Sequence, residues 1–229
     1  MENEFNWREF DAYLFDVDGT LLNSRDAVHY EAFLIAMREM YGRPVRMEGV
    51  PVQGSTDPLI LLHALRQAGV NEAEGRAVLP QAMARMCSEV EARSDQLRPE
   101  LCEAVPKLLA ELKAMGKLMG VTSGNIERIG WAKLRAAGID KYFCFGSFSD
   151  RNETRTEIFR WGAIEARRQL GVEARICFIG DTPADVSAAK ACGFPVIAVA
   201  TGIFSLVELA KGEPEMCIPG CETLWSYAE

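Results

Sequence analysis

Short apolar segments alternate with helical patterns along most of this chain, and this alternation is the feature that most restricts its fold. A β-prone apolar run that is bounded by polar residues and followed by a helical pattern is typical of a parallel sheet covered on both faces. The sequence therefore predicts an α/β fold, with a Rossmann-like parallel sheet and helices on both sides. The expected strands lie at 11–17, 118–122, 142–145, 175–179 and 196–199, and helices are expected at 105–115, 126–137, 156–170 and 183–192.

The segment between the first two strands has a different character. From residue 28 to residue 40 apolar side chains recur at helical spacing, and 59–67 and 72–93 also have helical patterns, whereas no convincing strand is found. We expect an all-helical domain at 23–100, inserted into an α/β core that comprises 1–22 and 101–229.

Composition excludes several classes of partner. The chain has 229 residues, 48% of them hydrophobic, which is enough to bury a core, and its net charge of −8 argues against nucleic acid or an anionic membrane. With no apolar leader and no membrane span, a cytoplasmic protein acting on a small solute is expected. Seven cysteines without a CxxC pair and two histidines predict reduced thiols rather than a zinc site. Oligomeric state is not predicted.

Acidic residues follow two of the expected strands. Asp16 and Asp18 lie at the carboxyl end of the first strand, and Asp181 and Asp185 follow the strand at 175–179. The carboxyl ends of parallel strands meet at one edge of a sheet, so these acids should converge there. Such a cluster needs a cation, and oxygen ligands without clustered His or Cys favour Mg²⁺. The sequence thus predicts a magnesium site.

A phosphate-binding segment follows the strand at 118–122. The Thr122 hydroxyl and the backbone N–H groups of Ser123, Gly124 and Asn125, at the start of a helix, suit a phosphate group. Gly19 and Thr20 are also predicted to bind substrate phosphate. A metal site, a phosphate-binding segment and a free carboxylate together indicate phosphoryl transfer. Asp16 would attack phosphorus, and Asp18 would protonate the leaving oxygen and then activate water.

Asp16-Val17-Asp18-Gly19-Thr20, Thr122 and Gly180-Asp181-Thr182-Pro183-Ala184-Asp185 resemble the motifs of the haloacid dehalogenase superfamily. The helical insert resembles the small (C1-type) cap of that superfamily, and segments 54–57 and 121–125 resemble its phosphoglycolate phosphatase-like branch. The resemblance implies that Asp16 is the nucleophile, Asp18 the acid/base and Thr122 a phosphate donor. It also implies that Mg²⁺ is held by Asp16, the carbonyl of Asp18 and Asp181, with Asp185 in support.

The sequence departs from the family pattern at one cation. Family members use a basic residue, usually in a Lys-Pro pair, to offset charge between nucleophile and phosphoryl group, and no Lys-Pro follows the third strand here. Arg155 is the expected substitute and Arg151 the second choice, because a guanidinium carries a permanent charge and can grip phosphate with two donors.

Simpler structural roles and other functions remain open at this point. Asp185 would also suit the first turn of a helix, Thr122 a buried strand, and His29 a surface or packing position outside the site. The expected function is Mg²⁺-dependent hydrolysis of a small phosphorylated metabolite. The alternatives are a sugar-phosphate mutase of the β-phosphoglucomutase type and a non-catalytic regulator that binds Mg²⁺ and phosphate.

Overall fold

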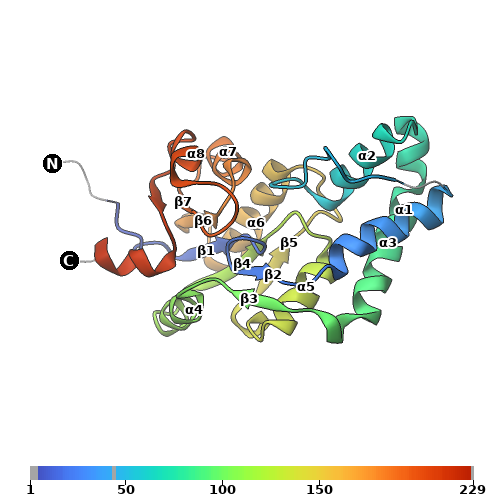
Figure 1. Ribbon diagram of the computed structural model, residues 1–229. Coiled ribbons are helices and arrows are strands. Elements are labelled where there is room, and N and C mark those ends of the chain that lie inside the picture. The colour runs from blue at the N-terminus through green and yellow to red at the C-terminus, as the bar shows by residue number, and fades with distance from the viewer. Residues whose placement is uncertain (1–4, 43–44, 228–229) are drawn as a thin grey trace.

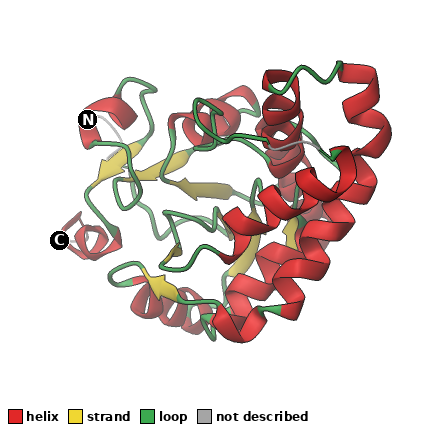
Figure 2. Cartoon of the chain, turned by 45° about the vertical axis from the view of Figure 1, so that its right-hand side comes forward, coloured by secondary structure: helices red, strands yellow, loops and turns green. Residues whose placement is uncertain are grey.

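A six-stranded parallel sheet forms the centre of the molecule (Figures 1 and 2). The computed structural model describes residues 5–42 and 45–227. The strand order is β5-β4-β1-β6-β7-β8, and every pairing within this sheet is parallel. The predicted α/β fold class is therefore confirmed. The strands are β1 (Ala12–Phe15), β4 (Leu118–Thr122), β5 (Phe145–Ser147), β6 (Ile176–Gly180), β7 (Val196–Val199) and β8 (Met216–Ile218).

Both faces of the sheet are buried, which explains why its central strands are apolar throughout. Along β1, Tyr13 and Phe15 point into one core cluster, and Ala12 and Leu14 into another. This is the two-residue alternation of a strand. The first cluster includes residues of α4 (Val105–Ala114) and α5 (Glu127–Ala136), and the second includes residues of α6 (Arg155–Leu170) and α7 (Pro183–Ala191). Helices thus cover the sheet on both sides.

Three helices form a separate layer at one end of the molecule (Figure 1). They are α1 (Val28–Tyr41), α2 (Asp57–Gln67) and α3 (Glu72–Ala92), and we call them, with their connecting loops, the helical insert. Their apolar faces share a core cluster. From the core side, Ile126, which precedes α5, and Ile129 and Ala132 of α5 contribute to it. The insert therefore rests on α5.

A two-stranded antiparallel ribbon joins the insert to the rest of the chain. It consists of β2 (Leu22–Ser24) and β3 (Pro99–Leu101). The boundaries expected from the sequence, after residues 22 and 100, fall inside these two strands. The chain thus leaves and re-enters the core through one narrow connection.

The structure differs from the sequence prediction in several elements. The strand expected at 142–145 begins only at Phe145, since Asp140–Tyr142 form a short 3₁₀ turn. The sequence reading did not identify β2, β3, β8, the helix α8 (Leu206–Ala210) or the 3₁₀ helices η1 (Ser94–Gln96) and η3 (Cys221–Tyr227). The C-terminal η3 packs near the N-terminus, where Trp7 Nε1 donates to the Leu224 carbonyl over 2.9 Å.

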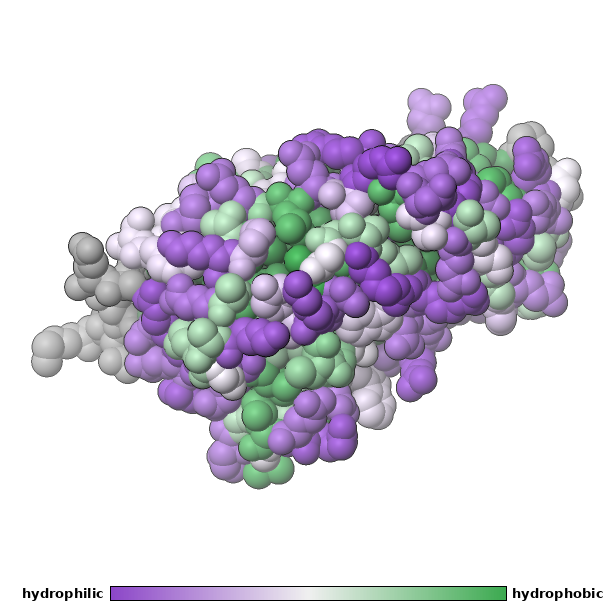
Figure 3. All heavy atoms as spheres, turned by 90° about the horizontal axis from the view of Figure 1, so that it is seen from below, coloured by the Kyte–Doolittle hydropathy of each residue, from purple (hydrophilic) through white to green (hydrophobic). Residues whose placement is uncertain are grey.

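The face of the molecule shown in Figure 3 is mainly polar. In Figure 3, hydrophilic residues surround small groups of apolar ones over the face shown. Among the described residues, we find no helix with the length and apolar content that a membrane span requires.

Candidate active site

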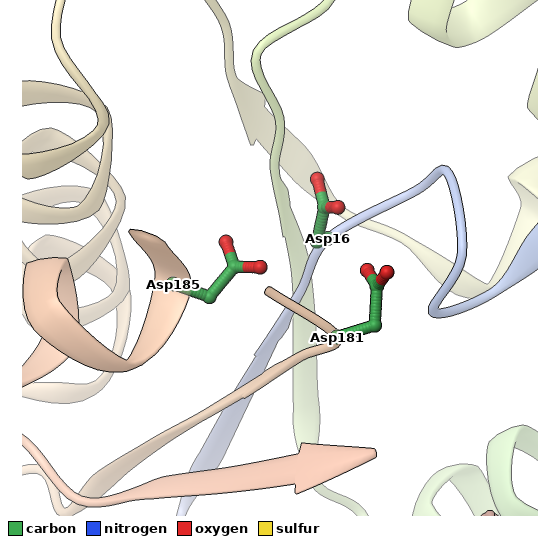
Figure 4. A group of neighbouring side chains, drawn as sticks. All are labelled: Asp16, Asp181 and Asp185. Carbon is green, nitrogen blue, oxygen red and sulfur yellow. The ribbon is translucent and has the colours of Figure 1, made fainter. Parts of the chain in front are cut away.

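Three aspartates converge at the carboxyl edge of the sheet (Figure 4). Asp16 follows β1, Asp181 follows β6, and Asp185 lies in the first turn of α7. Each offers a carboxylate oxygen, and these three oxygens lie within 4.8 Å of one another. All three residues are buried, with exposed fractions of 4%, 3% and 0%. The sequence prediction that these acids come together agrees with the structure.

The loop after β1 supports Asp181 directly. Thr20 Oγ1 donates to Asp181 Oδ1 over 2.9 Å. Gly19 has a φ of +88°, and a Cβ built on it would lie 2.2 Å from Asp181 Oδ2. Only glycine fits both this backbone conformation and this close approach. Gly19 and Thr20 were predicted to bind phosphate; the structure places both against the Asp181 carboxylate, where they shape the acidic cluster.

Asp185 has two structural partners. Its Oδ2 accepts from the Thr182 amide over 3.0 Å and from the Thr182 hydroxyl over 2.7 Å, which forms a capping box at the start of α7. Its Oδ1 accepts a hydrogen bond from Arg155. The helix-capping role and the place in the acidic cluster, which the sequence analysis treated as alternatives, therefore coexist in one side chain.

Arg155 is the cation of this cluster. It is the first residue of α6, whose start is fixed by a capping box between Thr154 and Glu157. Its Nη2 lies 3.1 Å from Asp16 Oδ2 and also contacts Asp185, and the side chain is 9% exposed. Arg151 is exposed. Of the two arginines that the sequence offered, Arg155 is the one beside the acids.

Negative charge nevertheless exceeds positive charge in the cluster, because three carboxylates face one guanidinium. Burial, followed by the charges of Asp16 and Asp185, raises the pKa of Asp181 to about 8. Burial also raises the pKa of Asp16 to about 6, although Arg155 opposes this shift. A divalent cation would remove the imbalance, and the hard oxygen donors suit Mg²⁺. The residues present therefore fit this metal.

Asp18 points to a second cation that the sequence analysis missed. Lys133 Nζ lies 2.8 Å from Asp18 Oδ1 and 2.7 Å from Oδ2, and it donates to Asn125 Oδ1 over 2.9 Å. Asn125 Nδ2 also donates to Asp18 over 2.8 Å. Burial tends to raise the pKa of Asp18, but Lys133 and Asn125 outweigh it and hold the pKa below its usual range.

The spacing of Lys133 along α5 indicates in the sequence that this lysine is buried. With Ile126, Ile129 and Gly130 it completes an i, i+3, i+4, i+7 stripe on the buried side of α5 and the turn before it, and Lys133 itself is 3% exposed. A lysine on the apolar stripe of a helix needs a buried partner. That observation alone predicts a paired lysine, although it does not identify Asp18.

Some of the donors in the predicted phosphate-binding segment already form hydrogen bonds within the protein. The Ser123 amide donates to the Ser147 carbonyl over 3.1 Å, and the Asn125 amide donates to Ser123 Oγ over 3.3 Å. Two of the three backbone donors that the sequence suggested are therefore used within the protein. Within the described part of the chain, the Gly124 amide has no acceptor, and the buried Thr122 hydroxyl has no hydrogen-bond partner. Of these two donors, the Gly124 amide belongs to a residue that lines the cavity between the core and the insert, whereas Thr122 is fully buried.

A cavity of about 300 Å³ opens above the acids, between the core and the insert. Asp16, Asp18 and Arg155 line its core side. On the insert side, the loop before α2 lies on the segment after β4, where a Cβ on Gly124 would be 2.3 Å from the Ser55 carbonyl oxygen. His29, which the sequence analysis assigned to the surface or to packing, stacks on Phe33 and also lines this cavity.

Known proteins resemble the chain along most of its length. The model of the haloacid dehalogenase-like hydrolase family matches residues 10–193. "Probable phosphatase IndB" of Dickeya dadantii (strain 3937) is 25% identical over 211 residues, which cover 90% of this chain and 87% of the relative. A phosphoglycolate phosphatase of Rhodobacter capsulatus is 25% identical over 229 residues, covering 95% and 99%.

Solved structures share the fold. A predicted phosphoglycolate phosphatase from Haemophilus somnus 129PT superimposes with a TM-score of 0.72 at 19% identity, over 96% of this chain and 98% of the other. An archaeal β-phosphoglucomutase from Pyrococcus sp. strain ST 04 has a TM-score of 0.60 at 20% identity, over 95% and 98%. The same architecture thus occurs in structures described as phosphatase and as mutase.

Proposed function

Because the chain belongs to the haloacid dehalogenase-like hydrolase family, in its phosphoglycolate phosphatase-like branch, we propose that it hydrolyses small phosphomonoesters through an aspartyl-phosphate on Asp16, with Mg²⁺ as cofactor. The family and the two phosphatase relatives identify the chain as a phosphatase. One observation carries the finer proposal. Asp16 lines the cavity and belongs at the same time to a cluster with Asp181, Asp185 and Arg155.

The reaction needs two transfers of the phosphoryl group. A carboxylate oxygen of Asp16 attacks phosphorus and the bond to the leaving oxygen breaks. Asp18, which Lys133 keeps ionised in the free site, must take up a proton as the ester binds and then gives that proton to the leaving oxygen. Water then attacks the aspartyl-phosphate, anionic Asp18 takes a proton from the water, and Asp16 and inorganic phosphate are released. Lys133 and Asn125 orient Asp18 for this exchange.

The phosphate oxygens would meet Arg155, the Thr122 hydroxyl and the Gly124 amide. Arg155 adds a permanent positive charge where the phosphoryl group is transferred, while the other two are donors that lack a partner in the described structure. Donors that are already oriented lower the barrier because they need no reorganisation during the reaction.

Mg²⁺ would be held by Asp16, Asp181 and the backbone carbonyl of Asp18, with Asp185 in support. The excess negative charge of the cluster supports this assignment. When bound, the metal would neutralise phosphate charge and align the phosphoryl group with the nucleophile.

The helical insert would act as a cap. We assign 23–100 to the cap domain and 1–22 with 101–229 to the catalytic core. Because the narrow β2–β3 ribbon is the covalent connection and the cavity lies between the two parts, a hinge motion there would admit substrate and then exclude water.

The test is release of inorganic phosphate from a panel of small phosphomonoesters, with Mg²⁺ or with EDTA, by wild type and Asp16→Asn. We expect Mg²⁺-dependent release that the variant loses, because an amide is a poor nucleophile. Robust turnover by Asp16→Asn would contradict the assignment of the nucleophile. Turnover of a phosphosugar only with a bisphosphate primer, and without phosphate release, would indicate a mutase instead.

A further inference from the structure

The charge of the cavity lining restricts the leaving group. Two cationic side chains from the core line the cavity, and both face carboxylates, Lys133 with Asp18 and Arg155 with Asp16. Within residues 5–42 and 45–227, no lysine or arginine of the insert lines it. The insert does contribute carboxylates, namely Asp26 and Asp57.

His29 of the insert also lines the cavity, and it lies beside one of these carboxylates. Its Nε2 lies 3.2 Å from Asp57 Oδ2. Asp57 is 3% exposed, and its Oδ2 also accepts the Ile126 amide over 2.8 Å, which fixes the carboxylate in place. His29 Nε2 forms no hydrogen bond in the described structure, and the fixed Asp57 carboxylate beside it keeps a negative charge on this side of the cavity.

The remaining insert lining is apolar or neutral. Phe33, Met47 and Ile60 are buried beside the cavity, and Gln53 and Ser55 supply uncharged polar groups. A leaving group that carries a carboxylate would enter this space without a cation to meet it and with Asp57 nearby. Juxtaposed like charges are strongly unfavourable when water is displaced.

We propose that the cavity selects phosphomonoesters whose leaving group is uncharged or positively charged, and discriminates against leaving groups that carry a carboxylate. Phosphoglycolate belongs to the disfavoured class. This inference rests on the phosphatase function proposed above and specifies the substrate class of that same site.

A series of three two-carbon esters of similar size varies the charge of the leaving group. Phosphoglycolate, 2-hydroxyethyl phosphate and phosphoethanolamine have two-carbon leaving groups that end in a carboxylate, a hydroxyl and an ammonium group. We expect kcat/KM for phosphoglycolate to be at least about tenfold below the values for the other two. Equal or better kcat/KM with phosphoglycolate would overturn the inference and leave the phosphatase function intact.

A gain of function tests the same point in the other direction. Gln53→Lys places a cation in the insert lining. It should raise the ratio of kcat/KM for phosphoglycolate to kcat/KM for 2-hydroxyethyl phosphate about fivefold or more. Gln81→Lys makes the same change of charge at an exposed position of α3 outside the cavity and should leave the ratio unchanged. An unchanged ratio in Gln53→Lys would contradict the proposal.

Hydrolysis of p-nitrophenyl phosphate, an activated ester, distinguishes failure of the charge argument from failure of the proposed phosphatase function. If it is hydrolysed, inhibition constants of the three esters against it rank their binding even where turnover is slow. We expect the weakest inhibition from phosphoglycolate, and the reverse order would refute the charge argument. If neither p-nitrophenyl phosphate nor the three esters are hydrolysed with Mg²⁺, the phosphatase function fails and this inference fails with it.

Discussion

Replacing Arg155 with Met should reduce both activity and stability, because this guanidinium compensates two buried carboxylates. The side chains of Arg155, Asp16 and Asp185 are 9%, 5% and 0% exposed, so water cannot replace the lost partner. Breaking a buried pair from one side costs about 3–5 kcal/mol. In a chain of this length 1 kcal/mol shifts Tm by about 2–4 °C, so a loss of 3 kcal/mol lowers Tm by about 6–12 °C.

In free energy, the effect on catalysis should be comparable to the effect on folding. Removal of one oriented charged donor at the transferring group typically costs about 10²–10³ in kcat. Arg155→Lys keeps the charge but loses the planar guanidinium, whose Nη2 contacts both Asp16 and Asp185, so we expect an intermediate loss of about tenfold. Kinetics with p-nitrophenyl phosphate at saturating Mg²⁺, below the Tm of every variant, measure these ratios.

The exposed Arg151 provides the matched control. Arg151→Met should keep the kcat and Tm of wild type. If Arg155→Met instead retained more than about a third of the kcat of wild type, the transferring phosphoryl group would not need this charge, and the reasoning would be refuted.

Further predictions concern Lys133, Gly19 and Asp181. Lys133→Met should lower kcat about 10–100-fold by releasing Asp18. It should lower the free energy of unfolding, measured in urea, by only about 1–2 kcal/mol, because the Asp18 side chain is 41% exposed and can be hydrated. An unchanged kcat would remove Lys133 from the site. Gly19→Ala should weaken Mg²⁺ binding measured by calorimetry, whereas Gly138→Ala, with a φ of +70° and no atom within 4 Å of the added Cβ, should not. In EDTA, the contribution of Asp181 to the free energy of unfolding should fall as pH rises from about 4 to 8, because its carboxyl group keeps the proton in the folded state and loses it near 3.8 when unfolded. Asp181→Asn should flatten that profile in urea titrations, and an equally steep profile in the variant would assign the effect to another group.

The sheet and its acidic edge were predictable because both depend on the pattern of apolar and polar residues within short segments of the sequence. A strand buried on two faces must be apolar, as β1 and β6 are, and the residues at its carboxyl end are free to be polar. Asp16 and Asp181 could therefore be placed together from their positions after two such strands.

Elements that depend on distant partners were not predictable in this way. The segment 142–145 is apolar and β-prone, yet Phe143 is buried by packing on Phe15, with ring centroids 5.9 Å apart, rather than by strand pairing. β2 and β3 have three residues each and exist because they pair with one another across the whole insert. A three-residue segment contains too little periodicity to indicate a strand.

The two cations of the site show the same difference between local and distant information. Arg155 stands beside a Thr-Glu capping signal at the start of a helix, in a chain segment where a positive charge was expected. Lys133 pairs with Asp18, which is 115 residues away in the sequence. Its buried position on α5 therefore predicts that it has a partner but does not identify Asp18 as that partner. The structure thus assigns one cation to Asp16 and another to Asp18. Because the two ion pairs are separate, Arg155→Met should lower kcat/KM for every ester. Lys133→Met should lower kcat/KM least for esters with good leaving groups, which need no proton from Asp18, while its kcat should fall for all esters because hydrolysis of the aspartyl-phosphate still needs Asp18 as the base.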